Sequence, residues 1–225
     1  MHIISLVNSK GGVGKTTLSI NIATYLNMRG YRVCLVDADP QSSIRDWRNE
    51  SELESFDVMG LYKPQTLKSL PTIGSDLYDF AIVDTPGKFE DTTKVAVEIS
   101  SAVLVPVHPS SWEVWAIPET LRMIKIQRAK HKNLISRIVI NRVIRNCTLT
   151  KQIDEALDGY DIDISSTYVM QRAEYEKMAC KGKTIFHGKN KAAKEGQREI
   201  EELSNEILLL IAADKINKLK GKRNA

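Results

Sequence analysis

Residues 8–17 read NSKGGVGKTT and stand between an apolar run that ends at Val7 and a segment with helical periodicity. A glycine-rich loop between a strand and a helix is typical of loops that bind the phosphates of a nucleoside triphosphate. Gly11, Gly12 and Gly14 let the backbone turn its N–H groups toward phosphate oxygens, and the positive end of the next helix attracts the same anion. The stretch therefore predicts a phosphate-binding loop, or P-loop, at residues 8–17.

The side chains of this loop suit a magnesium nucleotide. Lys15 supplies a point charge for the β- and γ-phosphates, the hydroxyl of Thr16 can bind Mg²⁺, and Thr17 lies where it could contact a more internal phosphate. The predicted nucleotide-binding residues of the loop are Gly11, Gly12, Val13, Gly14, Lys15, Thr16 and Thr17.

The loop departs from the general G-x-x-x-x-G-K-[ST] pattern at two positions. Ser9 stands where a glycine is expected, and Lys10 adds a second lysine at the mouth of the loop. A lysine there cannot easily fold back onto its own phosphates, so we expect Lys10 to reach the nucleotide of a facing subunit. The alternative is a solvated loop lysine with no partner subunit.

Three aspartates follow predicted strands at the same edge of the sheet. Asp37 and Asp39 come after the second strand, and Asp84 closes the run DFAIVDTPG. Phosphoryl transfer depends on positioning and charge placement, so we assign Asp39 to the attacking water and Asp37 and Asp84 to the magnesium shell together with Thr16. The alternative for Asp84 is a helix N-cap or turn residue. The predicted catalytic residues are Lys10, Lys15 and Asp39.

The overall composition is that of one α/β domain over residues 1–225. The 225 residues can bury a full core without help from metals or disulfides. The longest uncharged run is too short and too rich in proline to span a bilayer, so we expect a cytoplasmic protein with no membrane segment. Three cysteines without metal-ligand spacing suggest reduced packing residues: Cys34, Cys147 and Cys180.

Apolar, β-branched runs alternate with helical patterns along the chain. Several runs are apolar throughout, which is typical of parallel strands buried on both faces. The pattern predicts a doubly wound, mostly parallel sheet with helices on both faces and ligands at its carboxyl edge. We expect strands at residues 2–7, 32–36, 80–83, 102–107 and 135–140, and helices at residues 16–29, 42–49, 90–99, 114–130, 149–157 and from 195 onward.

Charge is distributed unevenly between the two halves. Residues 1–119 carry 10 Lys and Arg against 15 Asp and Glu, whereas residues 120–225 carry 22 against 13. Residues 120–151 contain nine basic residues and no acid, which suggests a polyanionic partner; a solvated helix face is the alternative. We also expect residues 180–194 to form an exposed basic loop and residues 215–225 to fray into a basic tail.

The motifs KGGVGKTT, VDADPQ and DTPG, in this order, resemble those of the deviant-Walker ATPases of the ParA/MinD superfamily. The chain is most similar to small ParF-like ParA partition ATPases, including TYVMQRAEYEKM around Arg172 and AAKEGQREIEEL before the last helix. The resemblance implies Mg²⁺-dependent hydrolysis of ATP and an ATP-sandwich dimer in which Lys10 crosses to the partner's nucleotide. Asn141 in VINRV matches the family position that contacts adenine, and Arg142 follows it in the nucleotide site.

The resemblance also implies a cellular role. Dimers formed on ATP bind nucleoid DNA without sequence preference, a ParB- or ParG-like partner stimulates hydrolysis, and DNA or another cargo is segregated, through a gradient of dimers or a polymer. Phosphate contacts need only lysine and arginine. The DNA-binding candidates are Arg142, Arg145, Arg172, Lys181, Lys183, Lys189 and Lys191.

Two other function classes are compatible with parts of the sequence. Residues 207–219 are amphipathic with a lysine-rich end, which would suit a MinD-like, membrane-associated positioning ATPase. A metabolic P-loop enzyme would share the loop without needing Lys10 or a basic carboxyl half. The chain departs from its relatives in carrying Trp112 and Trp115, and in reading Val-Met-Gln-Arg where many have Ile-Pro-Arg.

Overall fold

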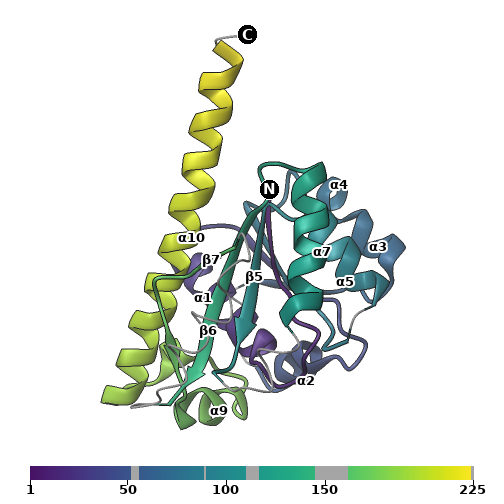
Figure 1. Cartoon of the computed structure of the whole chain (residues 1–225). Coiled ribbons are helices and arrows are strands. Elements are labelled where there is room, and N and C mark those ends of the chain that lie inside the picture. Colours follow the sequence, from purple (N-terminus) through teal and green to yellow (C-terminus); the bar gives the residue numbers. More distant parts are fainter. Residues whose placement is uncertain (52–55, 89, 110–116, 145–161, 224–225) are drawn as a thin grey trace.

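The fold is a parallel β-sheet between two layers of helices (Figure 1). The computed structural model describes residues 1–51, 56–88, 90–109, 117–144 and 162–223. The strand order is β3-β2-β4-β1-β5-β6-β7, β8 pairs with β6, and all the described strand pairs are parallel. The predicted doubly wound α/β fold is confirmed.

The described strands are β1 (His2–Leu6), β2 (Val33–Asp37), β3 (Asp57–Gly60), β4 (Phe80–Asp84), β5 (Ala102–Val107), β6 (Ile135–Val143), β7 (Asp163–Ile164) and β8 (Val169–Met170). The described helices are α1 (Lys15–Met28), α2 (Ser43–Asn49), α3 (Pro64–Lys68), α4 (Leu70–Gly74), α5 (Asp91–Ile99), α7 (Ile117–Lys130), α9 (Ala173–Ala179), the 3₁₀ helix η1 (Ile185–His187) and α10 (Lys191–Arg223).

The central strands bury both of their faces, as the continuous apolar runs predict. In β1, Ile4 and Leu6 pack with α1 and α10, whereas Ile3 belongs to a second cluster with α3, α4 and α5. A third cluster joins β5 and β6 to α7 on that second side. Figure 1 accordingly shows α7 and α10 on opposite sides of the strands. Burial on two faces leaves the strand ends as the place for polar chemistry.

The predicted strands are all present: residues 102–107 match β5 at both ends, and the other ends differ by at most three residues. The prediction of an exposed loop at residues 180–194 is wrong, because η1 lies within it, Ile185 is fully buried, and α10 begins at Lys191 rather than at residue 195. Its lysines remain exposed. β3, β7, β8, α3, α4 and α9 carried no clear sequence signal, and the helix predicted at 149–157 lies outside the described residues, as do Trp112 and Trp115.

Helix α10 is longer than expected and extends beyond the body of the molecule in Figure 1. Ile200, Leu203, Ile207 and Ile211 form its buried stripe. The helix then continues to Arg223, so the predicted fraying of residues 215–225 is wrong for all but the last two, which are not described. Within the described part of the chain, no helix combines the length and apolar character needed to cross a membrane.

Candidate nucleotide-binding site

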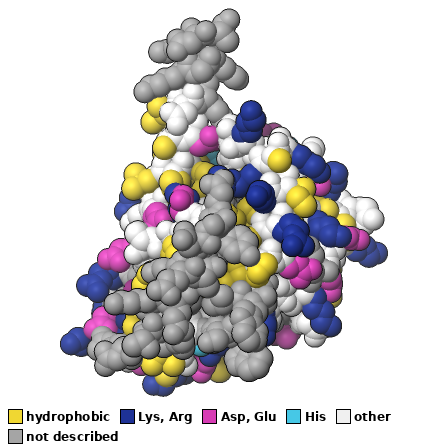
Figure 2. All heavy atoms as spheres, viewed as in Figure 1, with side chains coloured by type: hydrophobic (Ala, Val, Ile, Leu, Met, Phe, Trp, Pro, Cys, Tyr) yellow, Lys and Arg dark blue, Asp and Glu magenta, His cyan; other side chains and the backbone are white. Residues whose placement is uncertain are grey.

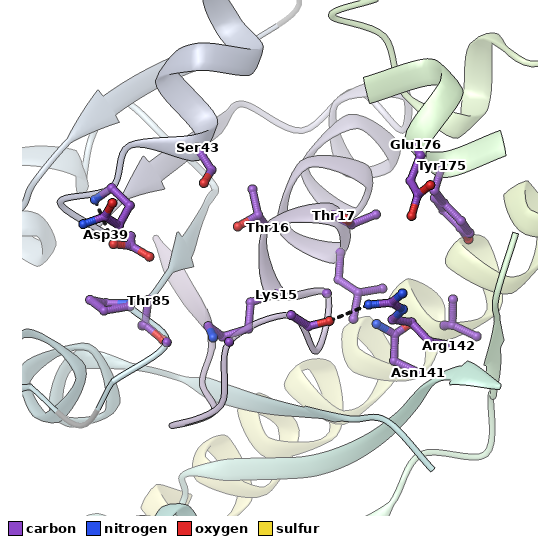
Figure 3. Close-up of a pocket in the computed structure, with 18 of the residues that line it drawn as sticks. Lys15, Thr16, Thr17, Asp39, Ser43, Thr85, Asn141, Arg142, Tyr175 and Glu176 are labelled. Carbon is purple, nitrogen blue, oxygen red and sulfur yellow. Dashed lines mark hydrogen bonds between the residues drawn. The ribbon is translucent and has the colours of Figure 1, made fainter. Parts of the chain in front are cut away.

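The P-loop opens onto a cavity of about 580 Å³ at the carboxyl ends of the strands (Figure 3). Strand register explains why the predicted residues meet there. Leu6 is the register partner of Asp84, and Asp84 is the partner of Asp37, so β1, β4 and β2 end side by side. The loop after β1 and the two strand-terminal aspartates therefore share one edge of the sheet, as the sequence predicts.

Backbone geometry explains one of the loop's glycines in particular. Gly14 has φ of +90°, in the left-handed region that disfavours L side chains. A Cβ atom on Gly14 would also lie only 2.3 Å from Nδ2 of Asn141. Because Asn141 Nδ2 donates a 2.7 Å hydrogen bond to the carbonyl of Val13, a glycine at position 14 allows β6 to brace the loop.

Lys15 is held inside the loop. Its side chain is buried, and its Nζ donates to the carbonyl oxygens of Asn8 at 3.1 Å and Lys10 at 3.0 Å. Burial lowers the pKa of Lys15, and the nearby charges of Asp84 and Asp39 oppose that effect. Backbone carbonyls thus hold an ammonium group where a phosphate would be a stronger partner.

Asp84 is fully buried beneath the loop. Its Oδ2 accepts a 2.5 Å hydrogen bond from Thr16, and its Oδ1 accepts a 3.3 Å bond from Ser19. Burial raises the pKa of Asp84 to about 7, against the opposing effects of the Thr16 hydrogen bond and the Lys15 charge. A carboxylate joined to the first threonine of α1 is the arrangement expected at a P-loop magnesium site.

Asp37 and Asp39 occupy different environments. Asp37 is buried and accepts backbone N–H bonds from Asp39 at 3.2 Å and Arg45 at 3.4 Å, and burial raises its pKa. Asp39 lines the cavity, and its Oδ1 accepts the N–H of Gln41 at 2.9 Å. The structure therefore places Asp39 in the cavity wall and Asp37 behind it, where it shapes the loop that carries Asp39.

Lys10 does not line its own cavity. Its backbone N–H donates to Oδ1 of Asn8 at 2.9 Å, and Asn8 is itself bonded to the carbonyl of Pro106 at 2.8 Å. The residue is exposed and lies outside the set that lines the cavity, although Gly11 beside it is part of that set. The fixed backbone and exposed side chain leave the predicted contact of Lys10 with another molecule open.

The opposite side of the cavity is built by β6, β8 and α9. In Figure 3, Asn141, Arg142, Tyr175 and Glu176 lie on one side of Lys15, and Asp39 and Thr85 lie on the other. Arg142 Nη1 donates to the carbonyl of Gly12 at 2.8 Å. Tyr175 and Glu176 were not predicted as lining residues. They lie on the short helix α9, and its local sequence does not indicate which part of the molecule it packs against.

The residues present fit a magnesium nucleotide. Cβ atoms built on Gly11 and Gly12 would meet no atom within 4 Å, so the loop has free space beside its backbone. The buried ammonium of Lys15 provides the charge for a phosphate. Thr16 and Asp84 are the residues that would hold the magnesium ion. Asp37, which was predicted to share this role, instead accepts backbone N–H bonds from Asp39 and Arg45.

Comparison with known proteins gives the same assignment. Residues 4–185 match the family described as the CobQ/CobB/MinD/ParA nucleotide binding domain. The chain belongs to this family. It is 30% identical over 212 residues to maintenance of carboxysome distribution protein A of Halothiobacillus neapolitanus, covering 91% of this chain and 95% of that protein.

Two further matches agree with the family. The chain is 25% identical over 228 residues to the sporulation initiation inhibitor protein Soj of Bacillus subtilis, covering 82% of this chain and 90% of that protein. Its fold matches a putative plasmid partition protein of Borrelia burgdorferi, whose crystal structure holds AMPPNP, with a TM-score of 0.70 and 21% identity, over 91% and 98% of the two chains.

The predicted DNA-binding residues of this ParA/MinD family member fall into different environments. Lys181, Lys183, Lys189 and Lys191 are exposed around η1 and the start of α10. Arg142 contacts the P-loop instead, and Arg145 lies outside the described residues.

The predicted contact of Arg172 with DNA does not fit the structure. The Arg172 side chain is 10% exposed, and its guanidinium is paired with Glu195 and Glu199 of α10. A buried guanidinium already neutralised by two carboxylates is not available to a DNA phosphate, so the structure argues against this candidate.

The acid-free stretch of residues 120–151 also looks different in three dimensions. Arg137 pairs with Asp163 at 2.7 Å and with Glu206 at 3.5 Å, so acids from later in the chain neutralise it. Figure 2 shows Lys and Arg side chains over α7 and its neighbouring helices interspersed with Asp and Glu. The expected packing role of Cys180 is likewise wrong, because Cys180 is exposed, whereas Cys34 is buried.

Proposed function

We propose that this protein is a ParA-type ATPase that dimerises on ATP, binds DNA without sequence preference and segregates DNA or another cargo. The observation that carries the proposal is the gathering of Lys15, Thr16 and Asp39 around the cavity at one sheet edge, with Asp84 bonded to Thr16 beneath the loop. These are the groups that bind phosphates, hold magnesium and orient water in nucleotide hydrolysis.

Each residue has a distinct part in the proposed reaction. Lys15 exchanges its two carbonyl partners for phosphate oxygens, and the loop N–H groups neutralise the rest of that charge. Thr16 and Asp84 hold the magnesium ion, which offsets charge on the phosphates when bound. Asp39, held by its bond from the Gln41 N–H, orients the attacking water toward the terminal phosphate.

The proposed dimer depends on Lys10. Its exposure at the cavity mouth supports a contact with the nucleotide of a second copy, which would make dimerisation conditional on ATP. The exposed lysines around η1 then supply phosphate contacts to DNA, and a dimer doubles their number. This arrangement would place the protein in the cytoplasm on the nucleoid and leave release to a ParB- or ParG-like partner that stimulates hydrolysis.

The names of the relatives bear on the cargo. One is a carboxysome distribution protein, one is a sporulation inhibitor, and one structural neighbour is a putative plasmid partition protein crystallised with AMPPNP. The first and third names support a positioning or partition role, and they differ in cargo, a carboxysome in one and a plasmid in the other. The cargo is therefore left open within the proposal.

The test is binding to random-sequence duplex DNA with ATP, with ADP and without nucleotide, at two salt concentrations. The wild-type protein should bind only with ATP and more weakly at high salt. Lys10→Ala should bind ATP and fail to bind DNA, because it loses the dimer. DNA binding that ignores the nucleotide, or a Lys10→Ala variant that dimerises normally, would contradict the proposal.

A second candidate is a MinD-like role at a membrane surface, and α10 is the observation that favours it. Leu209 and Ile216 are 72% and 53% exposed, and Lys215 is exposed as well. An amphipathic helix with lysines can lie on anionic lipid. Sedimentation with anionic liposomes and ATP tests this role, and clear binding without DNA would rank it first.

A further inference from the structure

The wall of the cavity on the side of β8 and α9, which we call the base-side wall, rests on little β structure. Strand β8 is two residues long, and its pairing with β6 shifts register between Asn141 and Val143. One further backbone bond joins the N–H of Gln171 to the carbonyl of Val143 at 2.9 Å. The base-side wall comprises Val169, Met170, Gln171, Arg172, Tyr175 and Glu176. Other contacts must fix its position.

Two carboxylates of α10 provide those contacts. Glu199 accepts the backbone N–H of Met170 at 3.1 Å through Oε2 and Nη2 of Arg172 at 2.5 Å through Oε1. Glu195 accepts Nη1 of Arg172 at 2.9 Å. The side chains of Arg172 and Glu199 are each 10% exposed. A largely buried charge network therefore ties the base-side wall to α10.

A second contact between the base-side wall and α10 is made by Tyr175, three residues after Arg172. The hydroxyl of Tyr175, which is buried, donates to the carbonyl of Gly196 at 3.3 Å. A Cβ atom at position 196 would lie 3.1 Å from Cγ1 of Ile185 and 3.3 Å from the Tyr175 hydroxyl, so the glycine permits this close approach. Helix α10 thus contacts the wall on both sides of Arg172.

The network is directed away from the phosphates. Both terminal nitrogens of Arg172 face carboxylates of α10, while the phosphate end of the cavity is built by residues 11–16. Bidentate and bridging guanidinium–carboxylate pairs fix geometry as well as charge. Removing one partner leaves a buried charge unpaired, and the wall must move to solvate it.

We infer that Arg172, Glu195 and Glu199 form a positioning network that sets the shape of the base-side wall, and with it the affinity and base preference of the site. The inference rests on the proposed function in taking a purine nucleotide as the ligand. None of the three residues is catalytic, because each acts through the wall rather than on the reacting phosphates. The phosphate loop keeps its own contacts whether or not the network is intact.

The test compares Arg172→Lys and Glu199→Gln with the wild type in the absence of DNA. Fluorescent ATP and GTP analogues report base-side recognition, and inorganic tripolyphosphate, used as a competitor, reports the phosphate loop alone. We expect ATP affinity to fall about tenfold and the ATP-to-GTP affinity ratio to fall with it. Tripolyphosphate affinity and kcat should stay within about twofold of the wild type, so that KM carries the change.

Two further variants keep the test decisive. Glu202→Gln breaks the exposed Arg198–Glu202 pair on the same helix, where the side chains are 70% and 56% exposed, and should match the wild type throughout. Glu195→Gln, at a 24% exposed position, should show the same ratio change at smaller size if the more buried variants fail to fold. Thermal melting identifies the folded variants.

The result that overturns the network is a folded Arg172→Lys or Glu199→Gln variant with unchanged ATP and GTP affinities. A fall in tripolyphosphate affinity parallel to that of ATP would overturn it as well, because the effect would then not be confined to the wall. Wild-type protein that binds no nucleotide would instead remove the proposed function itself. The two failures are therefore distinguishable in one set of titrations.

Discussion

The hydroxyl of Thr16 lies 2.5 Å from Oδ2 of Asp84 and donates a hydrogen bond to it. This bond joins the first turn of α1 to the end of β4, across a sequence separation of 68 residues. It pre-arranges the hydroxyl and the carboxylate that we assign to magnesium, and it keeps the buried carboxylate paired when no ion is bound. The site is therefore organised by contacts between side chains from separate parts of the chain.

Asp84→Asn should remove the magnesium-dependent part of nucleotide binding. An amide is a poorer magnesium ligand than a carboxylate and carries no charge. We expect ATP titrations of the variant to give the same affinity with magnesium and with EDTA, whereas the wild type should bind more tightly with magnesium. Thr16→Ser, which retains the hydroxyl, serves as the control. A variant that keeps the full magnesium effect would contradict the assignment of Asp84.

Lys15→Ala should lose ATP binding, whereas Lys10→Ala should keep it. The reason is the burial of Lys15 inside the loop, bonded to Asn8 and Lys10 carbonyls, against the exposure of Lys10 at the mouth. Isothermal titration measures binding, and light scattering with ATP measures the dimer. The two lysines would prove equivalent, against our expectation, if both variants lost ATP affinity to the same degree.

Gly14→Ala should destabilise the protein and weaken nucleotide binding. The left-handed backbone at Gly14 costs an L residue about 1–2 kcal/mol, and the new Cβ would displace Asn141 from Val13. Gly11→Ala is the matched control for stability, because a Cβ there meets nothing within 4 Å. Thermal melting without nucleotide should show a lower Tm for Gly14→Ala alone. Equal melting temperatures would show that the loop tolerates a side chain at position 14.

The double variant Lys189→Glu/Lys191→Glu should weaken DNA binding and its salt dependence. Each lost phosphate contact makes the negative slope of log Kobs against log salt shallower by about 0.9, so the loss of two contacts makes it shallower by about 2. The control is Lys125→Glu/Lys130→Glu, on α7 at the opposite face of the sheet. Fluorescence anisotropy with ATP measures both. A larger loss in the α7 pair would move the DNA surface to that helix.

Cysteine labelling should separate Cys180 from Cys34. Burial raises the pKa of the Cys34 thiol to about 12, so at pH 8 it stays protonated and sheltered, because the thiolate is the reactive form. Cys180 is exposed. Brief treatment of the folded protein with iodoacetamide, followed by peptide mass spectrometry, should find Cys180 modified and Cys34 intact. Denatured protein, in which both thiols react, provides the control; modification of Cys34 in the native state would indicate local opening of the sheet.

Most of the phosphate end of the site could be predicted from sequence, because it is local. The P-loop, the strand before it and the helix after it are contiguous in residues 2–28, and the glycine and lysine spacing defines how the backbone turns. Asp37 and Asp84 were predictable for a related reason. Parallel strands bring their carboxyl ends to one edge of the sheet, so an aspartate at the end of a strand lies at that edge.

The base-side wall could not be predicted in the same way. β8 and α9 are short, and nothing in the local pattern places Tyr175 or Glu176 beside a loop more than 150 residues earlier. The distribution of basic residues along the sequence also did not predict which of them are free of acidic partners. Arg172 was predicted to contact DNA, and Arg137 belongs to the acid-free stretch that suggested a polyanionic partner. Both side chains pair with acids of α10 that are distant in sequence.

The fold class, the phosphate loop and the acids at the sheet edge follow from the sequence alone, because apolar periodicity and glycine spacing act over a few residues. Which charges remain free depends on the folded structure, because neutralisation depends on which side chains are neighbours in space. The folded structure also decided where α10 begins and what it braces. Arg172 is the clearest case: the sequence marks it only as a basic residue, and the fold pairs it with Glu195 and Glu199.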